Sequence, residues 1–333
     1  MSALLEVRGL EVRYRARNGK GQVHAVNGVD LTIEEGETLG LVGESGCGKS
    51  TLGRAILALT PASAGSVQFR RTEILGKATL AAYRRKAQMV FQDPFAALNP
   101  RMTVFEILAE VLRVHRIAPP AEIPARVMDL MAQAGLSPEL AHRKGRTLSG
   151  GQCQRVGIAR ALAVGAELII ADEPVSALDV SIQAQILNLF SRLQQERGLA
   201  ILFISHDLGV VRYLCRRVAV MYLGRIIEEG ASEEVFAAPL HPYTQSLAAA
   251  IPKMAPDATL PGKPLGGEPP SPQDIPAGCP FHPRCPKVMD ICRTGAPPPA
   301  YQVDGRRVWC HLYSDRVQGA AGRPISERET NHA

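Results

Sequence analysis

The side chains with the clearest chemistry lie in a glycine-rich run, GESGCGKST, at positions 43–51. The run fits the phosphate-binding pattern G-x-x-x-x-G-K-S/T at every fixed position. Residues 38–42 before it predict a buried strand, and residues 52–59 after it place apolar side chains at helical spacing. Between a strand and a helix, glycines let successive N–H groups wrap around phosphates at the positive helix end. A nucleotide triphosphate is therefore the expected ligand, and a chance glycine-rich turn is the alternative.

The side chains of this run have separate expected roles. Lys49 reaches the β- and γ-phosphates, and Ser50 offers its hydroxyl to Mg²⁺. The expected nucleotide contacts are Gly43, Ser45, Gly46, Gly48, Lys49, Ser50 and Thr51. Upstream, Tyr14 ends a predicted strand, and its ring either stacks on an adenine base or packs on an edge strand. The local pattern leaves both roles open.

Polar side chains follow three predicted buried strands at the point where each strand ends. They are Gln92, the adjacent acids Asp172 and Glu173, and His206. Open α/β sheets present ligand-binding groups at the carboxyl ends of their strands. Adjacent carboxylates can divide the work there, with Asp172 directed toward Mg²⁺ through water and Glu173 toward an attacking water. A single histidine is more often structural, so the role of His206 depends on its neighbours.

A second helix start with anion-binding character carries the sequence LSGGQ at 148–152. Ser149 is predicted to cap this helix, and Gly150 and Gly151 leave bare N–H groups at its N-terminus. The alternative is an ordinary capped helix. If two copies of the fold face each other across a nucleotide, the second helix end of one copy could bind the phosphates held by the other.

The elements that must position these groups follow from apolar periodicity. Alternating residues within 4–14 and 29–33 predict an antiparallel layer before the glycine-rich run. Between 103 and 148 the spacing is helical and no strand is expected, with a proline pair at 119–120 separating two helices. Residues 218–228 predict a hairpin about a glycine. The expected fold class is therefore α/β, with an antiparallel layer and an inserted helical subdomain.

Composition bounds the class of protein. The chain has 333 residues, 46% hydrophobic and 21% charged, as expected for a globular protein with a main domain and an appendage. No apolar run approaches the roughly 18 residues that span a bilayer, and the N-terminus lacks the apolar core of a signal peptide. We therefore expect a cytoplasmic chain. The net charge is +6, but basic residues are scattered and aromatic residues are only 5%, so nucleic acid is not an expected partner.

Taken in order over residues 1–235, these motifs resemble those of the nucleotide-binding subunit of an ATP-binding cassette (ABC) transporter. The corresponding segments are the aromatic loop at Tyr14, Walker A at 43–51, the Q-loop at Gln92, the signature at 148–152, Walker B at 168–173, the D-loop at 176–179 and the switch at His206. The runs FQDPFAALNPRMTV, ADEPVSALDVSIQAQILNL and HPYTQSL are similar to those of the oligopeptide/dipeptide importer subfamily, in its F-type ATPase. Cys153 departs from the long polar residue that is common in that family.

This resemblance implies a P-loop NTPase cassette over residues 1–235, with a RecA-like core, a helical subdomain at about 95–160 and a C-terminal extension over 236–333. It also implies that two cassettes dimerise head to tail, so that Walker A of one and the signature of the other hold one ATP. The residues implied at the second face are Ser149, Gly150, Gly151, Gln152 and Asp179. Gln92 would ligate Mg²⁺, Glu173 would polarise water and His206 would hold the γ-phosphate.

The partners implied by the resemblance are a second ABC ATPase subunit in a heterodimer, two membrane permeases and an extracytoplasmic solute-binding protein. The chain would then lie at the cytoplasmic face of the inner membrane. Peptides are the default cargo, and nickel chelates, opines or glutathione stay open. The competing function is a soluble ABC ATPase acting on ribosomes or DNA. Such proteins usually carry two cassettes or a long coiled coil, and this sequence has neither.

The remaining sequence feature is a tail rich in proline and cysteine. About half of the 25 prolines lie between 256 and 299, which predicts linker and extended loop. Four of the seven cysteines lie in and after this stretch, at Cys279, Cys285, Cys292 and Cys310. A reducing cytoplasm disfavours disulfides, and the close C-x2–4-C spacing of most zinc sites is missing. The common close spacing of iron–sulfur sites is missing as well. The family resemblance nevertheless implies a [4Fe–4S] cluster on the four thiolates, with Zn²⁺ or structural thiols without metal as the alternatives.

Overall fold

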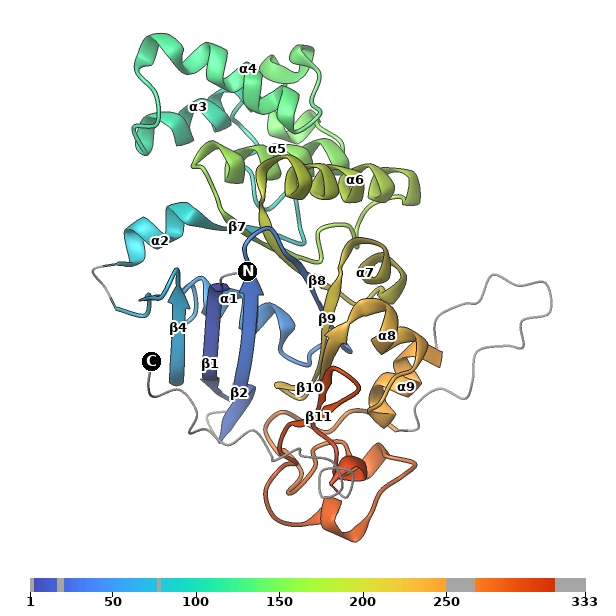
Figure 1. The fold of residues 1–333 in the computed structure, drawn as a ribbon. Helices are drawn as coiled ribbons and strands as arrows, with labels where there is room; N and C mark the ends of the chain where they lie inside the picture. Colours follow the sequence, from blue (N-terminus) through green and yellow to red (C-terminus); the bar gives the residue numbers. More distant parts are fainter. Residues whose placement is uncertain (1–2, 17–20, 77–78, 250–266, 315–333) are drawn as a thin grey trace, which may run out of the picture.

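The computed structural model describes residues 3–16, 21–76, 79–249 and 267–314. Within these residues the strands form a four-stranded antiparallel sheet and an eight-stranded mixed sheet. Figure 1 shows the smaller sheet on one side, helices α3 to α6 together at one end, and residues 267–314 at the other end. The expected α/β class, with an antiparallel layer and a helical insertion, is confirmed.

The antiparallel layer has the strand order β2-β1-β4-β5. Its strands are β1 (Ala3–Arg15), β2 (Gln22–Glu34), β4 (Ala64–Phe69) and β5 (Thr72–Glu73). The buried positions of β1 alternate with exposed ones because one face of this sheet packs on the core and the other meets solvent. That core also contains residues from β3, β7 and β8 of the main sheet.

The main sheet has the strand order β11-β12-β10-β9-β3-β8-β7-β6 in the described part of the chain. Its strands are β3 (Thr38–Val42), β6 (Ala87–Val90), β7 (Leu168–Asp172), β8 (Ala200–Ser205), β9 (Arg217–Tyr222), β10 (Arg225–Ala231), β11 (Tyr301–Val303) and β12 (Arg306–Val308). The five strands from β9 to β6 are parallel. Strands β3, β7 and β8 are buried along their whole length, as expected where both faces of a parallel sheet are covered.

The helices cover the two faces and one end of the main sheet. They are α1 (Lys49–Ile56), α2 (Leu80–Lys86), α3 (Val104–Val114), α4 (Ile123–Gln133), α5 (Gly150–Ala163), α6 (Val180–Arg197), α7 (Leu208–Leu214), α8 (Ser232–Ala237) and α9 (Pro242–Ala249). Residues 103–148, where no strand is expected from the sequence, are all described and contain helices without a named strand. Helix α3 begins at a capping box formed by Thr103 and Glu106, and Pro120 begins a short 3-10 turn before α4.

The C-terminal segment contains the predicted linker and extended loop at 256–299, of which residues 256–266 lie outside the described structure and residues 267–299 form turns without a named strand or α-helix. Strand β12 pairs antiparallel with β10, so the tail extends the main sheet. Cys279, Phe281 and Cys292 belong to the main apolar core, and Val308 and Cys310 to a smaller cluster with Leu240. Strand pairing and apolar packing therefore hold this segment.

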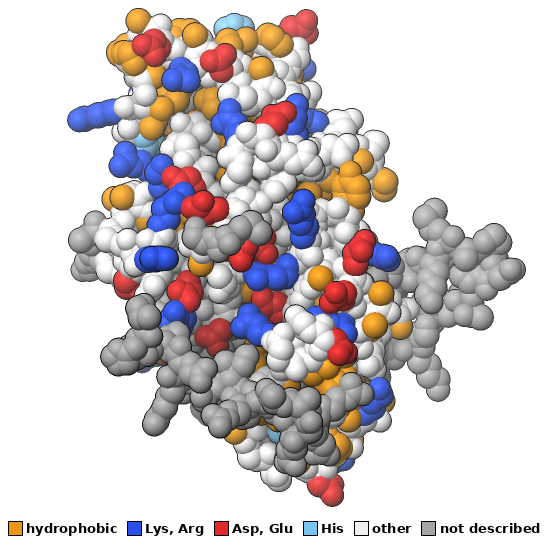
Figure 2. All heavy atoms as spheres, in the orientation of Figure 1, with side chains coloured by type: hydrophobic (Ala, Val, Ile, Leu, Met, Phe, Trp, Pro, Cys, Tyr) orange, Lys and Arg blue, Asp and Glu red, His pale blue; other side chains and the backbone are white. Residues whose placement is uncertain are grey.

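The surface shown in Figure 2 mixes basic and acidic side chains over the same elements. No helix among the described residues combines the length and the apolar character needed to cross a membrane.

Candidate functional site

The phosphate-binding loop lies between β3 and α1, as the sequence predicts. Gly48 has φ of +109°, and a Cβ there would lie 2.1 Å from the carbonyl oxygen of Ala25. Only glycine fits this position, because both the backbone angle and the contact exclude a side chain. Lys49 is the first residue of α1, and its Nζ donates to the carbonyl oxygens of Gly43 at 2.8 Å and Glu44 at 2.9 Å. The ammonium group is thus held over the loop that would surround the phosphates.

The predicted magnesium ligands meet beside this loop. Ser50 Oγ donates to Asp172 Oδ1 at 2.7 Å, although the two residues are 122 positions apart. Asp172 ends the buried strand β7 and is only 3% exposed. Burial raises the pKa of Asp172, and the hydrogen bond from Ser50 opposes that effect. A hydroxyl and a carboxylate in contact are the oxygen ligands that Mg²⁺ takes in nucleotide sites.

Two further predicted residues converge on the carboxylate of a third. Gln92 Nε2 donates to Glu173 Oε2 at 3.2 Å, and His206 Nδ1 lies 3.2 Å from the same oxygen. These residues follow the neighbouring strands β6, β7 and β8, whose carboxyl ends meet at one edge. Glu173 has φ of +46°, which is uncommon for a residue with a side chain and recurs at functional sites.

A cleft of about 630 Å³ joins the loop to this carboxylate. Ten predicted residues line it, namely Tyr14, Ser45, Gly46, Gly48, Lys49, Ser50, Thr51, Gln92, Glu173 and His206. Tyr14 is 40% exposed, so its ring is not buried as an edge-strand packing residue. The sequence reasoning missed Val23, Ala25 and Pro272, which also line the cleft. Val23 pairs with Tyr14 in the β1–β2 register, so a hairpin alignment would have found it, whereas no local pattern marks Pro272.

The residues predicted for the second face lie elsewhere. Ser149 caps α5 in a capping box with Gln152, as predicted for the cap. The Gln152 side chain accepts from the Ser149 N–H at 2.9 Å, so it serves the helix end. Gly151 lies against α6, where a Cβ would meet Ile182 at 2.4 Å. In the described structure, neither these residues nor the exposed Asp179 line the cleft.

Comparison with known proteins agrees with this geometry. The family model for the ABC transporter matches residues 26–176. A protein of Sinorhizobium fredii, named a probable peptide ABC transporter ATP-binding protein, is 50% identical over 317 residues, covering 93% of this chain and 90% of that protein. The chain belongs to the ABC transporter ATP-binding family. The oligopeptide transport ATP-binding protein AppF of Bacillus subtilis is 46% identical over 321 residues, which cover 93% of this chain and 98% of that protein.

Solved structures of ABC cassettes share the fold. The cassette MJ0796, in a dimeric post-hydrolysis state bound to ADP and Pi, has a TM-score of 0.62 and 32% identity. The match covers 68% of this chain and 98% of that chain. The cassette cbiO1 of Clostridium perfringens has a TM-score of 0.63 and 31% identity, covering 72% of this chain and 92% of that chain. The P-loop ABC ATPase fold predicted from the sequence is therefore confirmed.

The tail of this ABC ATPase has its own family match. The model for the oligopeptide/dipeptide transporter C-terminal region matches residues 227–292. Burial raises the pKa of Cys279 to about 11 and that of Cys310 to about 12, and the other three thiols of the array contribute to the shift at Cys310. The four cysteines, Cys279, Cys285, Cys292 and Cys310, thus share one neighbourhood. They are free, and the described residues contain no group of three or more His, Cys, Asp or Glu placed to hold a metal ion. The predicted metal centre is therefore not supported.

Proposed function

We propose that this ABC ATPase hydrolyses ATP with Mg²⁺ to energise import of peptides, acting as a peripheral subunit at the cytoplasmic face of the membrane. The observation that carries the ATPase part is the convergence of Gln92 and His206 on Glu173, at the edge of the cleft that Lys49 and Ser50 also line. The peptide part rests on the match to the oligopeptide/dipeptide transporter C-terminal region and on the names of the relatives.

The residue roles follow from the chemistry of the cleft. Lys49 neutralises the β- and γ-phosphates, and Ser50, Gln92 and Asp172 would hold Mg²⁺, with Asp172 acting through water. Glu173 accepts the proton of the attacking water, and His206 holds the γ-phosphate beside it. Tyr14 stacks on the base. A metal ion in this cleft supplies charge stabilisation to the transferred phosphoryl group.

The rest of the proposal concerns assembly. The signature residues 149–152 and Asp179 lie outside the cleft of their own chain, which supports a head-to-tail pair with a second ABC ATPase subunit. Two membrane permeases and an extracytoplasmic solute-binding protein complete the proposed transporter. We assign residues 1–235 to the cassette, with its helical subdomain at about 95–160, and residues 236–333 to the extension. An ATPase acting on ribosomes or DNA stays the competing function.

The [4Fe–4S] cluster on Cys279, Cys285, Cys292 and Cys310, with Zn²⁺ as the alternative, stays a prediction. It requires the four thiols to approach one another more closely than the described structure brings them. Iron and zinc analysis of protein purified without oxygen tests it, together with alkylation of the native protein. Four alkylated thiols and no bound metal would rule out both metals.

Reconstitution tests the function as a whole. The chain, its partner ATPase and the two permeases are placed in proteoliposomes with the solute-binding protein, and ATP hydrolysis and dipeptide uptake are followed together. We expect uptake to depend on ATP and Mg²⁺ and to stop with the Glu173→Gln variant. Uptake of nickel chelates without peptide uptake would refute the proposed cargo, and ATP hydrolysis stimulated only by ribosomes or DNA would refute the transport function.

A further inference from the structure

One ion pair ties the C-terminal extension directly to the phosphate-binding loop. Arg284 belongs to a 3-10 turn at His282–Arg284, and Glu44 is the second residue of the loop. The guanidinium makes two hydrogen bonds to the carboxylate, at 2.8 and 3.0 Å, across 240 positions of sequence. The Arg284 side chain is only 6% exposed. Paired, planar contacts of this kind fix geometry as well as charge.

A second residue from beyond position 235 also makes a hydrogen bond to Glu44. Tyr243 of α9 is fully buried, and its hydroxyl accepts the Glu44 N–H at 2.8 Å. Glu44 also offers its carbonyl oxygen to Lys49 Nζ. Its side chain and amide are therefore fixed by residues beyond 235, and its carbonyl by the lysine that faces the cleft. Glu44 thus links the extension to Lys49, which is proposed to contact the phosphates.

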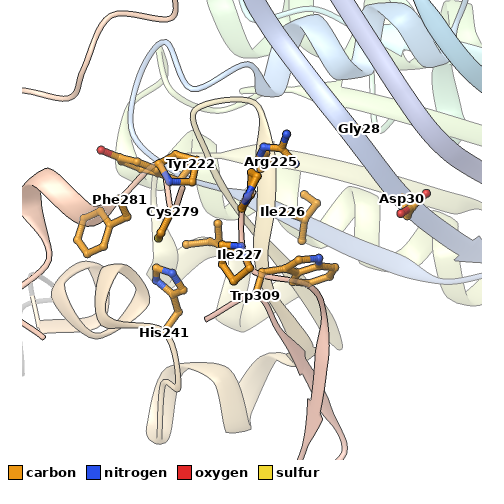
Figure 3. A pocket seen from close by; sticks show the side chains of 13 residues that line it. Gly28, Asp30, Tyr222, Arg225, Ile226, Ile227, His241, Cys279, Phe281 and Trp309 are labelled. Atoms are coloured by element: carbon orange, nitrogen blue, oxygen red, sulfur yellow. The ribbon is translucent and has the colours of Figure 1, made fainter. Parts of the chain in front are cut away.

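Arg284 lies beside a packed group of three aromatic rings. Tyr222 and Tyr243 lie 4.7 Å apart between ring centroids, and Phe281 lies 5.2 and 5.5 Å from them. The Arg284 guanidinium lies 6.0 Å from the centroid of the Tyr222 ring. Figure 3 shows Tyr222, Phe281 and His241 around Cys279, beside a small cavity of about 40 Å³. This aromatic group has little freedom to move, because each ring is packed against the next.

The extension reaches the nucleotide cleft at another point. Pro272 lines the cleft, and its carbonyl oxygen accepts the N–H of His24 on β2 at 2.9 Å. That strand also supplies Val23 and Ala25 to the lining. The extension therefore meets the cleft at the phosphate-binding loop and beside the position of Tyr14.

We infer that Arg284 is a positioning residue that sets the affinity of this ABC ATPase for ATP. By holding Glu44, it keeps the loop amides arranged for the phosphates before ATP arrives, so less ordering is needed on binding. The inference rests on the proposed function, because ATP is taken as the ligand. It gives the extension a role in the nucleotide site of its own chain, apart from any metal it holds.

The test measures ATP affinity and thermal stability of the full-length protein in parallel. Arg284→Gln should raise the Kd for MgATP about 3- to 30-fold, the range for residues that act through another group. Arg284→Lys keeps the charge but loses the paired geometry, and should recover part of the affinity. The matched control is Arg307→Gln, which breaks an ion pair of the extension with Glu229, at 2.5 Å, that includes no residue of the loop. It should lower the midpoint of unfolding without changing the Kd.

A double-mutant cycle separates positioning from general stabilisation. Glu44→Ala removes the pair from the loop side, so it remains informative if Arg284→Gln fails to fold. The effects of Arg284→Gln and Glu44→Ala on the Kd should overlap, with the double variant close to either single one. Additive effects, or a wild-type Kd in Glu44→Ala, would overturn the inference while leaving ATP binding by the wild type intact. Absence of ATP binding by the wild type would instead refute the proposed function.

Discussion

Replacement of Glu173 by glutamine tests the catalytic proposal most directly. Glu173 Oε2 lies 3.2 Å from both Gln92 Nε2 and His206 Nδ1, and its side chain is 16% exposed. Glutamine has nearly the same size and can keep one acceptor toward these neighbours. It loses the basicity needed to take a proton from water. The substitution therefore removes chemistry while changing packing very little.

The structure separates the expected effects on turnover and on binding. Loss of a general base lowers turnover by roughly 10²–10⁴-fold, which is about 3–5 kcal/mol of activation free energy. Binding of MgATP should be retained, because Lys49 and Ser50 are untouched. The negative charge of Glu173 also contributes to the raised pKa of Asp172, after burial. Removing the charge of Glu173 takes away one cause of the raised pKa of Asp172, so Asp172 should bind Mg²⁺ at least as well as before.

The assay compares steady-state ATP hydrolysis and the Kd for MgATP in the assembled transporter. Asp207→Asn is the matched control. It changes a carboxylate to an amide next to His206, and an asparagine side chain can still cap α7, where Asp207 now accepts from Gly209 and Val210. The control should hydrolyse ATP near the wild-type rate. Near-normal turnover in Glu173→Gln would remove Glu173 from the role of general base.

Three further predictions address the loop and the pH dependence of stability. Lys49→Ala should lose affinity for ATP as well as activity, and tight ATP binding in calorimetry would contradict its role in the ground state. Gly48→Ala should weaken ATP binding through a strain of about 1–3 kcal/mol, because its Cβ would lie 2.1 Å from the Ala25 oxygen; an unchanged Kd would argue against that geometry. Burial lowers the pKa of His241 to about 3. Below pH 6.5 the unfolded chain therefore binds a proton at this histidine that the folded chain does not bind. Acidification then lowers the free energy of unfolding by about 1.4 kcal/mol per pH unit. His241→Asn should flatten the fall of the unfolding midpoint between pH 6.5 and 5, and an unchanged slope would exclude His241 as its source.

Much of the nucleotide cleft could be predicted because its parts are local in sequence. A glycine-rich turn, a capped helix start and a polar residue after an apolar run each report their own backbone geometry. The parallel sheet then brings Gln92, Glu173 and His206 together without further information, since the carboxyl ends of neighbouring strands share an edge. The cap at Ser149 was predicted on the same grounds.

The contacts of the extension could not be predicted in this way. Glu44 and Arg284 are ordinary residues in their local sequences, and their pairing depends on how the tail returns to the cassette across 240 positions. The pairing of β12 with β10 depends on β12, which has only three residues and is too short to show an alternating pattern. The predicted metal centre is not supported by the described structure, and the spacing of the four cysteines in the sequence does not fix how closely their thiols approach one another.

The backbone at Glu173 shows why its carboxylate is positioned so firmly. A φ of +46° costs about 1–3 kcal/mol, so the surrounding structure must enforce it. The Glu173 N–H donates to the Ile204 carbonyl oxygen at 3.0 Å, and the Glu173 carbonyl accepts from the Ser176 hydroxyl at 3.1 Å. The first bond ties the residue to β8, which leads to His206. The second ties it to the turn that ends at exposed Asp179, before α6. In the proposed pair of cassettes, a subunit in contact with this turn would act on the backbone that positions the Glu173 carboxylate, and so assembly would affect hydrolysis through this short segment.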